Sequence, residues 1–384
     1  MALGRFVTLV RGTPPVTIDV LVLCFGNSIH ARRRIQVLSD DARFRVTVLT
    51  GAAYHVRGTE EHVLRSGGGE VLNHLRALEV LYQLILRRRP DLIVQQTLMY
   101  PSYLPMFITN NIPRIVTLWN GDVTWYATTS GLERRIKRGL LEANLRAATA
   151  VTVGSEFARA GALAHGAAQE RLHVAPYPGV DIERFSAALP RGDARKRSGI
   201  AADRAVVLAP RGLAPYQNPM DVVRAVAQVP RRPLLIMLHE PYDDLTALAG
   251  LARSLGVDVE FRVKGSFESM PALCRSADVV VSYSSHDSLP NTALETMACG
   301  VALVVGDTPP LRELVGGSRI PCVPIQDPAA LARAIATSLD SPAAQVEDGL
   351  TIARRFDSRV LSPRFRSLAL AVAEQGRRPT PGRK

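Results

Sequence analysis

The segment from Tyr283 to Val305 holds the densest set of side chains in this sequence that could do chemistry. Its first residues complete an apolar strand near Ser284, a polar loop follows, and a helix is expected to start near Pro290. The first N–H groups of a helix have no partner within the helix and carry partial positive charge, so they bind anions. The residues expected at this anion site are Ser288, Leu289, Pro290, Asn291 and Thr292.

Two carboxylates flank this expected helix start. Asp287 belongs to the loop, and Glu295, eight residues later, lies about one turn inside the helix. Together they could hold sugar hydroxyls on either side of a diphosphate that is bound at the N–H groups. A helix cap followed by a solvated glutamate explains the same residues, so the spacing alone leaves both interpretations open.

Strands that alternate with helices must position these residues. Short runs of apolar, β-branched residues are typical of buried parallel strands. The strands expected in the first half are 18–25, 45–49, 91–94, 114–118 and 150–153, with a helix over 70–88. Those expected in the second half are 205–209, 234–238, 259–263, 279–282 and 302–305. The pattern predicts two α/β halves, each with a parallel sheet.

Two further segments mark the boundaries of these halves. The stretch 186–203 is rich in small, charged, Pro and Gly residues and is predicted to be a linker. A final amphipathic helix is predicted over about 363–374, with Ser362 as its N-cap and Pro363 as its first residue. The tail 376–384 contains Pro, Gly and Arg and is expected to be disordered.

Composition narrows the class of protein. The 384 residues include 47 Lys and Arg against 35 Asp and Glu, a formal net charge of +12, which favours an anionic partner unless it reflects Arg-rich codon usage alone. The Arg clusters are scattered and aromatic residues make up only 5%, which argues against a nucleic-acid binder. None of the four cysteines forms a CxxC pair, so zinc and thioredoxin signatures are absent, and Cys24 and Cys299 are expected in the core.

The hydrophobic runs predict a cytoplasmic location. None reaches the roughly 18 residues of a membrane-spanning helix, and residues 1–16 make a poor secretory signal. The amphipathic basic run 133–141 could contact an anionic membrane at its inner face, but a solvated helix face explains it as well. The Arg residues at 32–34 and 87–89 have the same two interpretations.

The segment around Glu295 resembles the signature of retaining glycosyltransferases with the GT-B fold, specifically glycosyltransferase family 4. The resemblance lies in an acidic residue, seven others and a Glu before a small-residue run, here Asp287 to Glu295 followed by Thr296-Met-Ala-Cys-Gly300. Three further stretches agree and occur in the expected order over residues 18 to 360. They are Asn120-Gly-Asp122, Pro178-Gly-Val-Asp-Ile-Glu-Arg-Phe185 and Arg211-Gly-Leu-Ala-Pro215.

The resemblance implies a complete architecture. Residues 1–185 would form a Rossmann-like acceptor domain, and residues 204–360 a second such domain that binds a nucleoside-diphosphate sugar. The two would face each other across a cleft, and the final helix, 361–375, would pack back on the first domain. The implied activity is transfer of a sugar to an acceptor hydroxyl with retention of configuration, in the biosynthesis of a glycan, a glycolipid or a glycosylated metabolite.

The resemblance also assigns roles on the donor side. Arg211, Asp287 and Glu295 would be the catalytic residues, and Val263 with Lys264 would contact the base. Gln217 stands about where the family has a phosphate-binding Lys, so Arg211 would have neutral help only. No resident cofactor is implied. No metal site is expected either, because Asp40-Asp41 and Asp243-Asp244 lack the setting of a metal-binding pair.

Five residues are expected at the acceptor side or the mouth of the cleft. They are Gly26, Asn27, His30, Asp122 and His286. From composition alone, they are also explained as a plain strand-to-helix turn, a packed or capping histidine, a turn carboxylate and a surface loop. The acceptor stays open between a glycan, a lipid-linked glycan and a small molecule. The alternative function is a catalytically impaired GT-B homologue that binds a nucleotide sugar or a partner.

Overall fold

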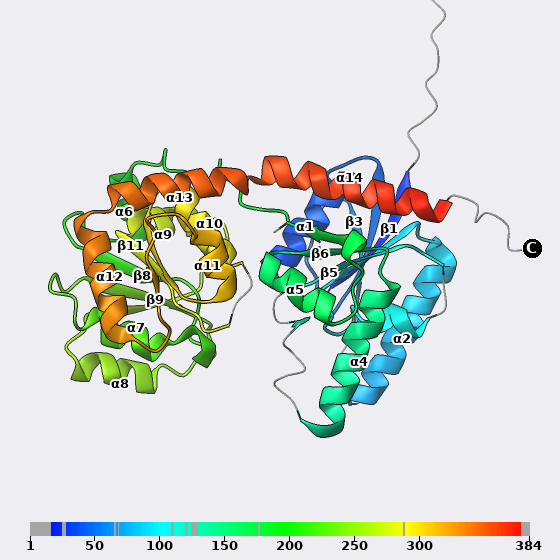
Figure 1. Ribbon diagram of the computed structural model, residues 1–384, viewed down its shortest axis with the longest axis horizontal. Coiled ribbons are helices and arrows are strands. Elements are labelled where there is room, and N and C mark those ends of the chain that lie inside the picture. The colour runs from blue at the N-terminus through cyan, green and yellow to red at the C-terminus, as the bar shows by residue number, and fades with distance from the viewer. Residues whose placement is uncertain are drawn as a thin grey trace, which may run out of the picture.

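The chain folds into two α/β domains of similar size, which stand side by side in Figure 1. The structure is a computed structural model that describes residues 17–24, 28–64, 67, 69–108, 111–119, 122–123, 130–175, 177–286 and 289–377. Gly26, Asn27, Asp287 and Ser288 lie outside the described residues.

The first domain is built on a seven-stranded sheet in the order β3-β2-β1-β4-β5-β6-β7. Every neighbouring pair is parallel. Its strands are β1 (Ile18–Cys24), β2 (Phe44–Thr50), β3 (Thr59–Val63), β4 (Leu92–Gln96), β5 (Arg114–Thr117), β6 (Ala150–Val153) and β7 (Leu172–Val174). Its helices are α1 (Ile29–Ser39), α2 (Glu70–Arg88), η1 (Leu104–Phe107), α4 (Gly131–Ala147), α5 (Glu156–Ala164) and η3 (Gln169–Arg171).

The second domain is built on a six-stranded parallel sheet in the order β10-β9-β8-β11-β12-β13. Its strands are β8 (Val206–Ala209), β9 (Leu234–His239), β10 (Val259–Val263), β11 (Val279–Ser282), β12 (Ala302–Gly306) and β13 (Cys322–Val323). Its helices are α6 (Arg191–Ser198), η4 (Pro215–Gln217), α7 (Pro219–Val226), α8 (Thr246–Ser254), α9 (Met270–Ser276), α10 (Asn291–Ala298), α11 (Pro309–Val315), α12 (Pro328–Asp340) and α13 (Ala343–Arg355). The prediction of two parallel-sheet domains is confirmed.

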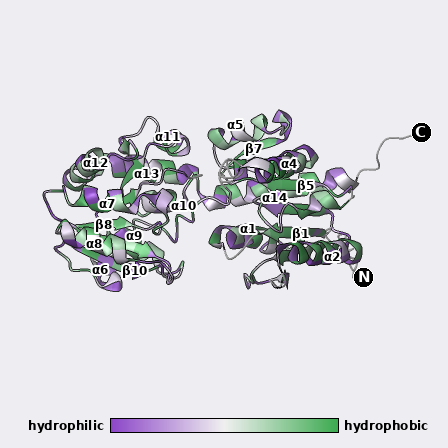
Figure 2. Ribbon diagram, turned by 90° about the horizontal axis from the view of Figure 1, so that it is seen from below, coloured by the Kyte–Doolittle hydropathy of each residue, from purple (hydrophilic) through white to green (hydrophobic). Residues whose placement is uncertain are grey.

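The central strands have the hydrophobic patterning that a doubly covered sheet requires. Figure 2 shows them as hydrophobic ribbons between helices of mixed hydropathy, and β1, β8 and β11 are almost wholly buried. The hydrophobic pattern of the sequence does not predict β3, β7 and β13. Each lies at an edge of its sheet, and β3 and β7 are partly exposed, so they lack a continuous apolar run.

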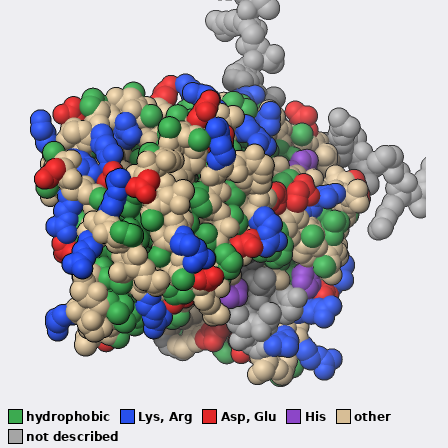
Figure 3. Space-filling view, turned by 60° about the vertical axis from the view of Figure 1, so that its left-hand side comes forward, with side chains coloured by type: hydrophobic (Ala, Val, Ile, Leu, Met, Phe, Trp, Pro, Cys, Tyr) green, Lys and Arg blue, Asp and Glu red, His purple; other side chains and the backbone are tan. Residues whose placement is uncertain are grey.

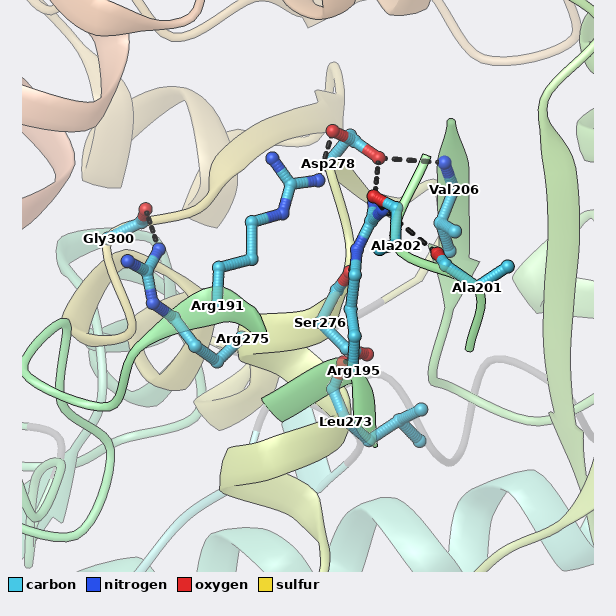
Figure 4. Close-up of polar contacts among 10 residues, drawn as sticks. All are labelled: Arg191, Arg195, Ala201, Ala202, Val206, Leu273, Arg275, Ser276, Asp278 and Gly300. Carbon is cyan, nitrogen blue, oxygen red and sulfur yellow. Dashed lines mark hydrogen bonds and ion pairs between the residues drawn. The ribbon is translucent and has the colours of Figure 1, made fainter. Parts of the chain in front are cut away.

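The predicted linker 186–203 is in part a helix of the second domain. Helix α6 occupies its middle, and Arg195 on that helix is buried (Figure 4). Its Nε donates to the carbonyl of Ser276 at 3.1 Å and its Nη2 to Asp278 at 2.8 Å. Charged residues in this stretch suggest a solvated linker, but here a buried guanidinium bonds to acceptors just before β11.

The two domains are joined a second time where the chain crosses back. Val180 and Asp357 form an isolated parallel bridge, in which Val180 N donates to Phe356 O and Ser358 N to Val180 O, both at 2.8 Å. Helix α14 (Ser358–Arg377) then covers the first domain, as Figure 1 shows in red. Its residues Leu361, Phe365, Ala369, Val372 and Ala373 join the core beneath α1.

The start of this last helix corrects the prediction. The helix begins at Ser358, so Pro363 lies inside it and Ser362 is not its N-cap. Asp357 accepts a hydrogen bond from Arg359 N at 2.9 Å, which is the bond expected of a cap. The helix also extends to Arg377, beyond the predicted start of the tail at 376, and residues 378–384 lie outside the described ones.

Three sequence-level expectations concern cysteine, membrane and charge. Cys24 and Cys299 are fully buried, as predicted. Within the described residues, no helix combines the length and apolar character needed to cross a bilayer. On the face shown in Figure 3, Lys and Arg side chains are interspersed with Asp and Glu and do not form a single patch.

Candidate active site

The candidate site is a cavity of about 280 Å³ between the two domains. Its lining comes from the carboxyl ends of strands and the starts of helices, where ligands bind in open α/β sheets. The first domain contributes His30, Arg34, Leu118, Trp119, Gly154 and Tyr177, and the second contributes Arg211, Tyr216, Leu289, Pro290 and Asn291. The structure therefore brings residues from both predicted sides into one cavity.

Arg211 follows β8 and is held in place by two side chains of its own domain. Its Nε lies 3.2 Å from Gln217 Oε1, and its Nη1 lies 3.3 Å from Thr292 Oγ1. Gln217, at the place where the resemblance suggests a Lys, is buried and accepts a bond from the guanidinium. Arg211 is thus oriented beside the start of α10.

Helix α10 starts at Asn291, as the sequence predicts, with Pro290 as its N-cap. Its first turn contacts the other domain, because Asn291 Nδ2 lies 2.8 Å from His30 Nδ1. Burial and the nearby Arg34, Arg33, Arg211 and Lys264 lower the pKa of His30 to about 3. The neutral imidazole accepts the amide bond, so His30 links the domains at the cavity and carries no charge near pH 7.

Glu295 lies one turn further along α10 and is buried, with 5% of its surface exposed. Burial raises the pKa of its carboxyl to about 7, against the opposing effect of Arg33, Arg211 and Lys264. Its Oε1 lies 4.0 Å from Arg33 Nη1 of the first domain. The carboxylate is therefore inside the interface between the domains and is not the solvated glutamate of the alternative interpretation.

Arg33 and Arg34 also belong to the site, although they are not among the site residues predicted from the sequence. Arg33 Nη2 donates to Gly179 O at 2.9 Å, and the guanidinium lies 5.5 Å from the ring centroid of Phe267 in the second domain. Arg34 is 9% exposed, and its Nε donates to Tyr177 O at 2.7 Å. Only Arg32 of this triplet has the exposed position of a solvated face.

A signal for Arg34 exists in the sequence. Ala31 precedes it by three residues and Leu38 follows it by four, so helical spacing places all three on one face. Ala31 and Leu38 are both buried in the core of the first domain. An arginine on the apolar face of a helix that follows a strand is the observation that could have marked it.

Asp122 is buried and bonded to the backbone of its own domain. It is 3% exposed, and its two oxygens accept the backbone N–H groups of Leu98 at 2.8 Å and Trp119 at 2.6 Å. Burial raises its pKa to about 7, with those two bonds and Arg34 acting in the opposite direction. This carboxyl ties the loops after β4 and β5 together, and its contact with a sugar hydroxyl stays a prediction.

Val263, Lys264 and His286 are not among the described residues that line the cavity, whereas Tyr216 is. Val263 and Lys264, at the end of β10, are exposed, and Lys264 Nζ lies 3.5 Å from Glu240 Oε1. His286 is exposed and its Nδ1 lies 3.1 Å from Ser285 Oγ. Tyr216 is 48% exposed, and its carbonyl accepts Ser285 N at 2.8 Å.

Two Rossmann-like domains that close on a cationic cavity, with a helix N-terminus at its edge, define the GT-B class of glycosyltransferase. Family models agree for both domains. The model described as "Glycosyl transferase 4-like domain" matches residues 9–178, and the one described as "Glycosyl transferases group 1" matches residues 204–341. The chain belongs to the GT-B glycosyltransferases of family 4.

Curated relatives match part of the chain. A D-inositol 3-phosphate glycosyltransferase from Kineococcus radiotolerans is 32% identical over 213 residues, which are 50% of this chain and 49% of that protein. One from Mycobacteroides abscessus is 33% identical over 153 residues, 38% of this chain and 34% of that protein. The matches thus span about a third to a half of these relatives.

Solved structures resemble the whole fold. Sucrose-phosphate synthase from Thermosynechococcus elongatus superposes with a TM-score of 0.78 at 18% identity, covering 91% of this chain and 98% of that one. Anabaena HepE, in a complex with UDP and glucose, gives 0.77 at 19% identity, covering 92% and 100%. At these identities the likeness concerns the fold alone.

Proposed function

We propose that this protein transfers a sugar from a nucleoside diphosphate to an acceptor hydroxyl and retains the configuration of the anomeric carbon. The observation that carries the proposal is the placement of Arg211 against Thr292 at the start of α10, at the edge of a cavity that both domains line. Two relatives act on D-inositol 3-phosphate by name, and a fold neighbour was solved with UDP.

In this proposal the second domain binds the donor. The diphosphate would lie against the free N–H groups of α10 and the guanidinium of Arg211, which balance the charge that develops as the diphosphate leaves. Glu295 would accept bonds from the ribose hydroxyls, and Asp287 would hold a hydroxyl of the transferred sugar. These charges come from protein groups, so we propose no resident metal ion or other cofactor.

Retention would follow if the acceptor attacks from the face that the leaving diphosphate vacates. The diphosphate oxygen would then take the proton of the acceptor hydroxyl. This step needs no protein base, which agrees with a His30 that is engaged by Asn291 and an Asp122 whose oxygens are both occupied. The anomeric coupling constant in the proton NMR spectrum of the product tests retention directly.

A thermal-shift panel with UDP, GDP, ADP and TDP tests the donor assignment. At a ligand concentration near 100 times its Kd, binding adds about 2.7 kcal/mol to the free energy of unfolding, which raises Tm by a few degrees in a protein of this size. Arg211→Ala is expected to abolish the shift, whereas Arg204→Ala, on an exposed arginine paired with Asp258, should keep it. Flat curves for all four nucleotides would refute a donor site.

A measurement of turnover distinguishes an active transferase from the alternative, a catalytically impaired homologue. If a nucleotide sugar binds and is neither transferred nor hydrolysed with any acceptor, the chain is a binding module. Gln217, which holds Arg211 in place of a second cation, is the feature that favours this alternative. A Gln217→Lys variant that gains turnover would identify the missing charge as the cause.

We also propose that the first domain contacts an anionic membrane surface. Helix α2 exposes Val71, Leu75, Tyr82 and Leu86, whose spacing of four, seven and four residues places them on one face. Helix α4 exposes Leu132 and Ile136 beside Arg134 and Arg135. Basic residues beside exposed apolar ones suit a surface of acidic lipid.

Sedimentation with vesicles tests this membrane contact. Binding is expected to vesicles that contain phosphatidylglycerol and to be lost in Leu75→Gln/Ile136→Gln, with Val360→Gln on α14 as the exposed apolar control. Equal binding by both variants, or none by the wild type, would refute it.

A further inference from the structure

The cavity has a cation on its acceptor side that the donor chemistry does not use. Among its described lining residues, Arg34 is the one charged side chain from the first domain, since His30 is neutral near pH 7. The donor groups, Arg211 and the start of α10, come from the second domain. Arg34 therefore lines, from the opposite domain, the cavity in which the proposed diphosphate would lie.

Arg34 is held rigidly, yet one of its donors is unused. Its Nε is bonded to Tyr177 O at 2.7 Å, and its guanidinium lies 5.6 Å from the ring centroid of Trp119. Its Nη1 is buried and has no hydrogen-bond partner within the part of the chain that the structure describes. A buried cation with an unused donor is costly unless a ligand supplies the acceptor.

Trp119 provides a second unused hydrogen-bond donor at the same cavity. Its Nε1 is also buried and makes no hydrogen bond to any described residue, and its ring lies against both Arg34 and His30. The loop that carries it is fixed by the bond from Trp119 N to Asp122. Two unused N–H donors, one of them charged, thus come from α1 and from the loop after β5, and both residues line the cavity.

We propose that the acceptor carries an acidic group, a phosphate or a carboxylate, which binds Arg34 and Trp119 Nε1. This inference rests on the proposed transferase function and names the class of its second substrate. An acidic group could take both donors at once, because it presents at least two oxygens to the guanidinium and the indole. The described lining of the cavity contains no carboxylate, and Asp122, which interacts electrostatically with Arg34 from outside that lining, has both oxygens bonded to backbone N–H groups.

Three hexoses that differ only in their acidic group provide the test. Glucose, glucose 6-phosphate and glucuronate are titrated calorimetrically into the full chain saturated with the nucleoside diphosphate that the thermal panel identifies. At least one acidic sugar is expected to bind about tenfold or more tightly than glucose, as one charge-assisted hydrogen bond provides. The stronger of the two identifies the acidic group.

Two variants test whether the preference for an acidic sugar depends on Arg34 and Trp119. Arg34→Gln is expected to remove the tenfold preference and leave nucleotide affinity within about twofold. Arg32→Gln loses the same charge from an exposed position on the same helix and should change neither. Because Arg34 also supports Tyr177, Trp119→Phe serves as a second variant that keeps the ring and the arginine and removes only the indole donor; it should weaken the preference severalfold.

The outcomes separate this inference from the proposed function. Equal binding of the three sugars, no binding by any of them, or a preference that survives both Arg34→Gln and Trp119→Phe would overturn the acidic acceptor and leave the donor site intact. Failure of the proposed function appears earlier, as an absence of nucleotide binding to the wild-type chain.

Discussion

Glu295 is expected to make nucleotide-sugar binding pH-dependent. Burial raises the pKa of its carboxyl to about 7, although three basic side chains oppose the shift. Ribose hydroxyls donate to a carboxylate, so the binding form is the ionised one and a proton must leave before the donor binds. At pH 6, one unit below the pKa, about a tenth of the molecules are ionised, and Kd is expected to be about tenfold higher than at pH 8.

Calorimetric titration with an intact nucleotide sugar between pH 6 and pH 8 measures this effect. The diphosphate of such a donor is esterified at both ends and does not titrate in this range. His30, with a pKa of about 3, also keeps its charge state. Asp122, whose carboxyl also has a pKa of about 7, titrates in the same range, so a variant is needed to attribute the change in Kd to Glu295.

Glu295→Gln is the matched variant, since it keeps the size of the side chain and cannot titrate. Its Kd should vary less than about twofold over the same range. Glu268→Gln, on an exposed carboxylate of the same domain, should retain the wild-type dependence. A flat profile in the wild type, or an equally steep one in Glu295→Gln, would refute the assignment of this carboxylate to the donor site.

Three further predictions concern stability and protonation. Gly179→Ala should lower the free energy of unfolding by about 2–4 kcal/mol, seen as a fall in Tm, because the residue has φ +82° and a Cβ would lie 2.2 Å from Phe356 O. Gly192→Ala, in helix α6 with nothing within 4 Å of its Cβ, should be neutral or stabilising by about 0.5 kcal/mol. Arg195→Met should cost about 3 kcal/mol in urea unfolding, because Asp278 and three carbonyls lose a buried partner, and a cost below 1 kcal/mol would contradict the buried role. The ring protons of His30 should show no titration by NMR from pH 5 to pH 8; a midpoint in that window would contradict its burial.

The fold was predictable where one local signal decides the structure. The apolar residues of β6 and β11, the alternating pattern of β10 and the spacing of α2 predict these elements to the residue. The start of α10 was predictable for the same reason, because a strand, a polar loop and Pro290 leave one place for it.

The rest depended on contacts between distant segments. Arg195 is polar by type and buried by its bonds to residues about eighty positions away, so composition suggested a linker where α6 forms. Pro363 is a good first residue for a helix, but the bridge between Val180 and Asp357 starts α14 earlier. Asp122 is a residue type that often binds ligands, and only the fold shows that its oxygens accept hydrogen bonds from the backbone of Leu98 and Trp119.

The crossing of α14 onto the first domain reverses the order in which the two domains can be completed during synthesis. The second domain has all its strands and helices once residue 355 has left the ribosome. The first domain is made earlier, but its core includes Leu361, Phe365, Ala369, Val372 and Ala373. The first domain therefore cannot complete its core until these residues emerge, and the apolar surface that they cover stays exposed until then. A nascent chain stalled near residue 355 should hold a protease-resistant second domain beside an incomplete first one.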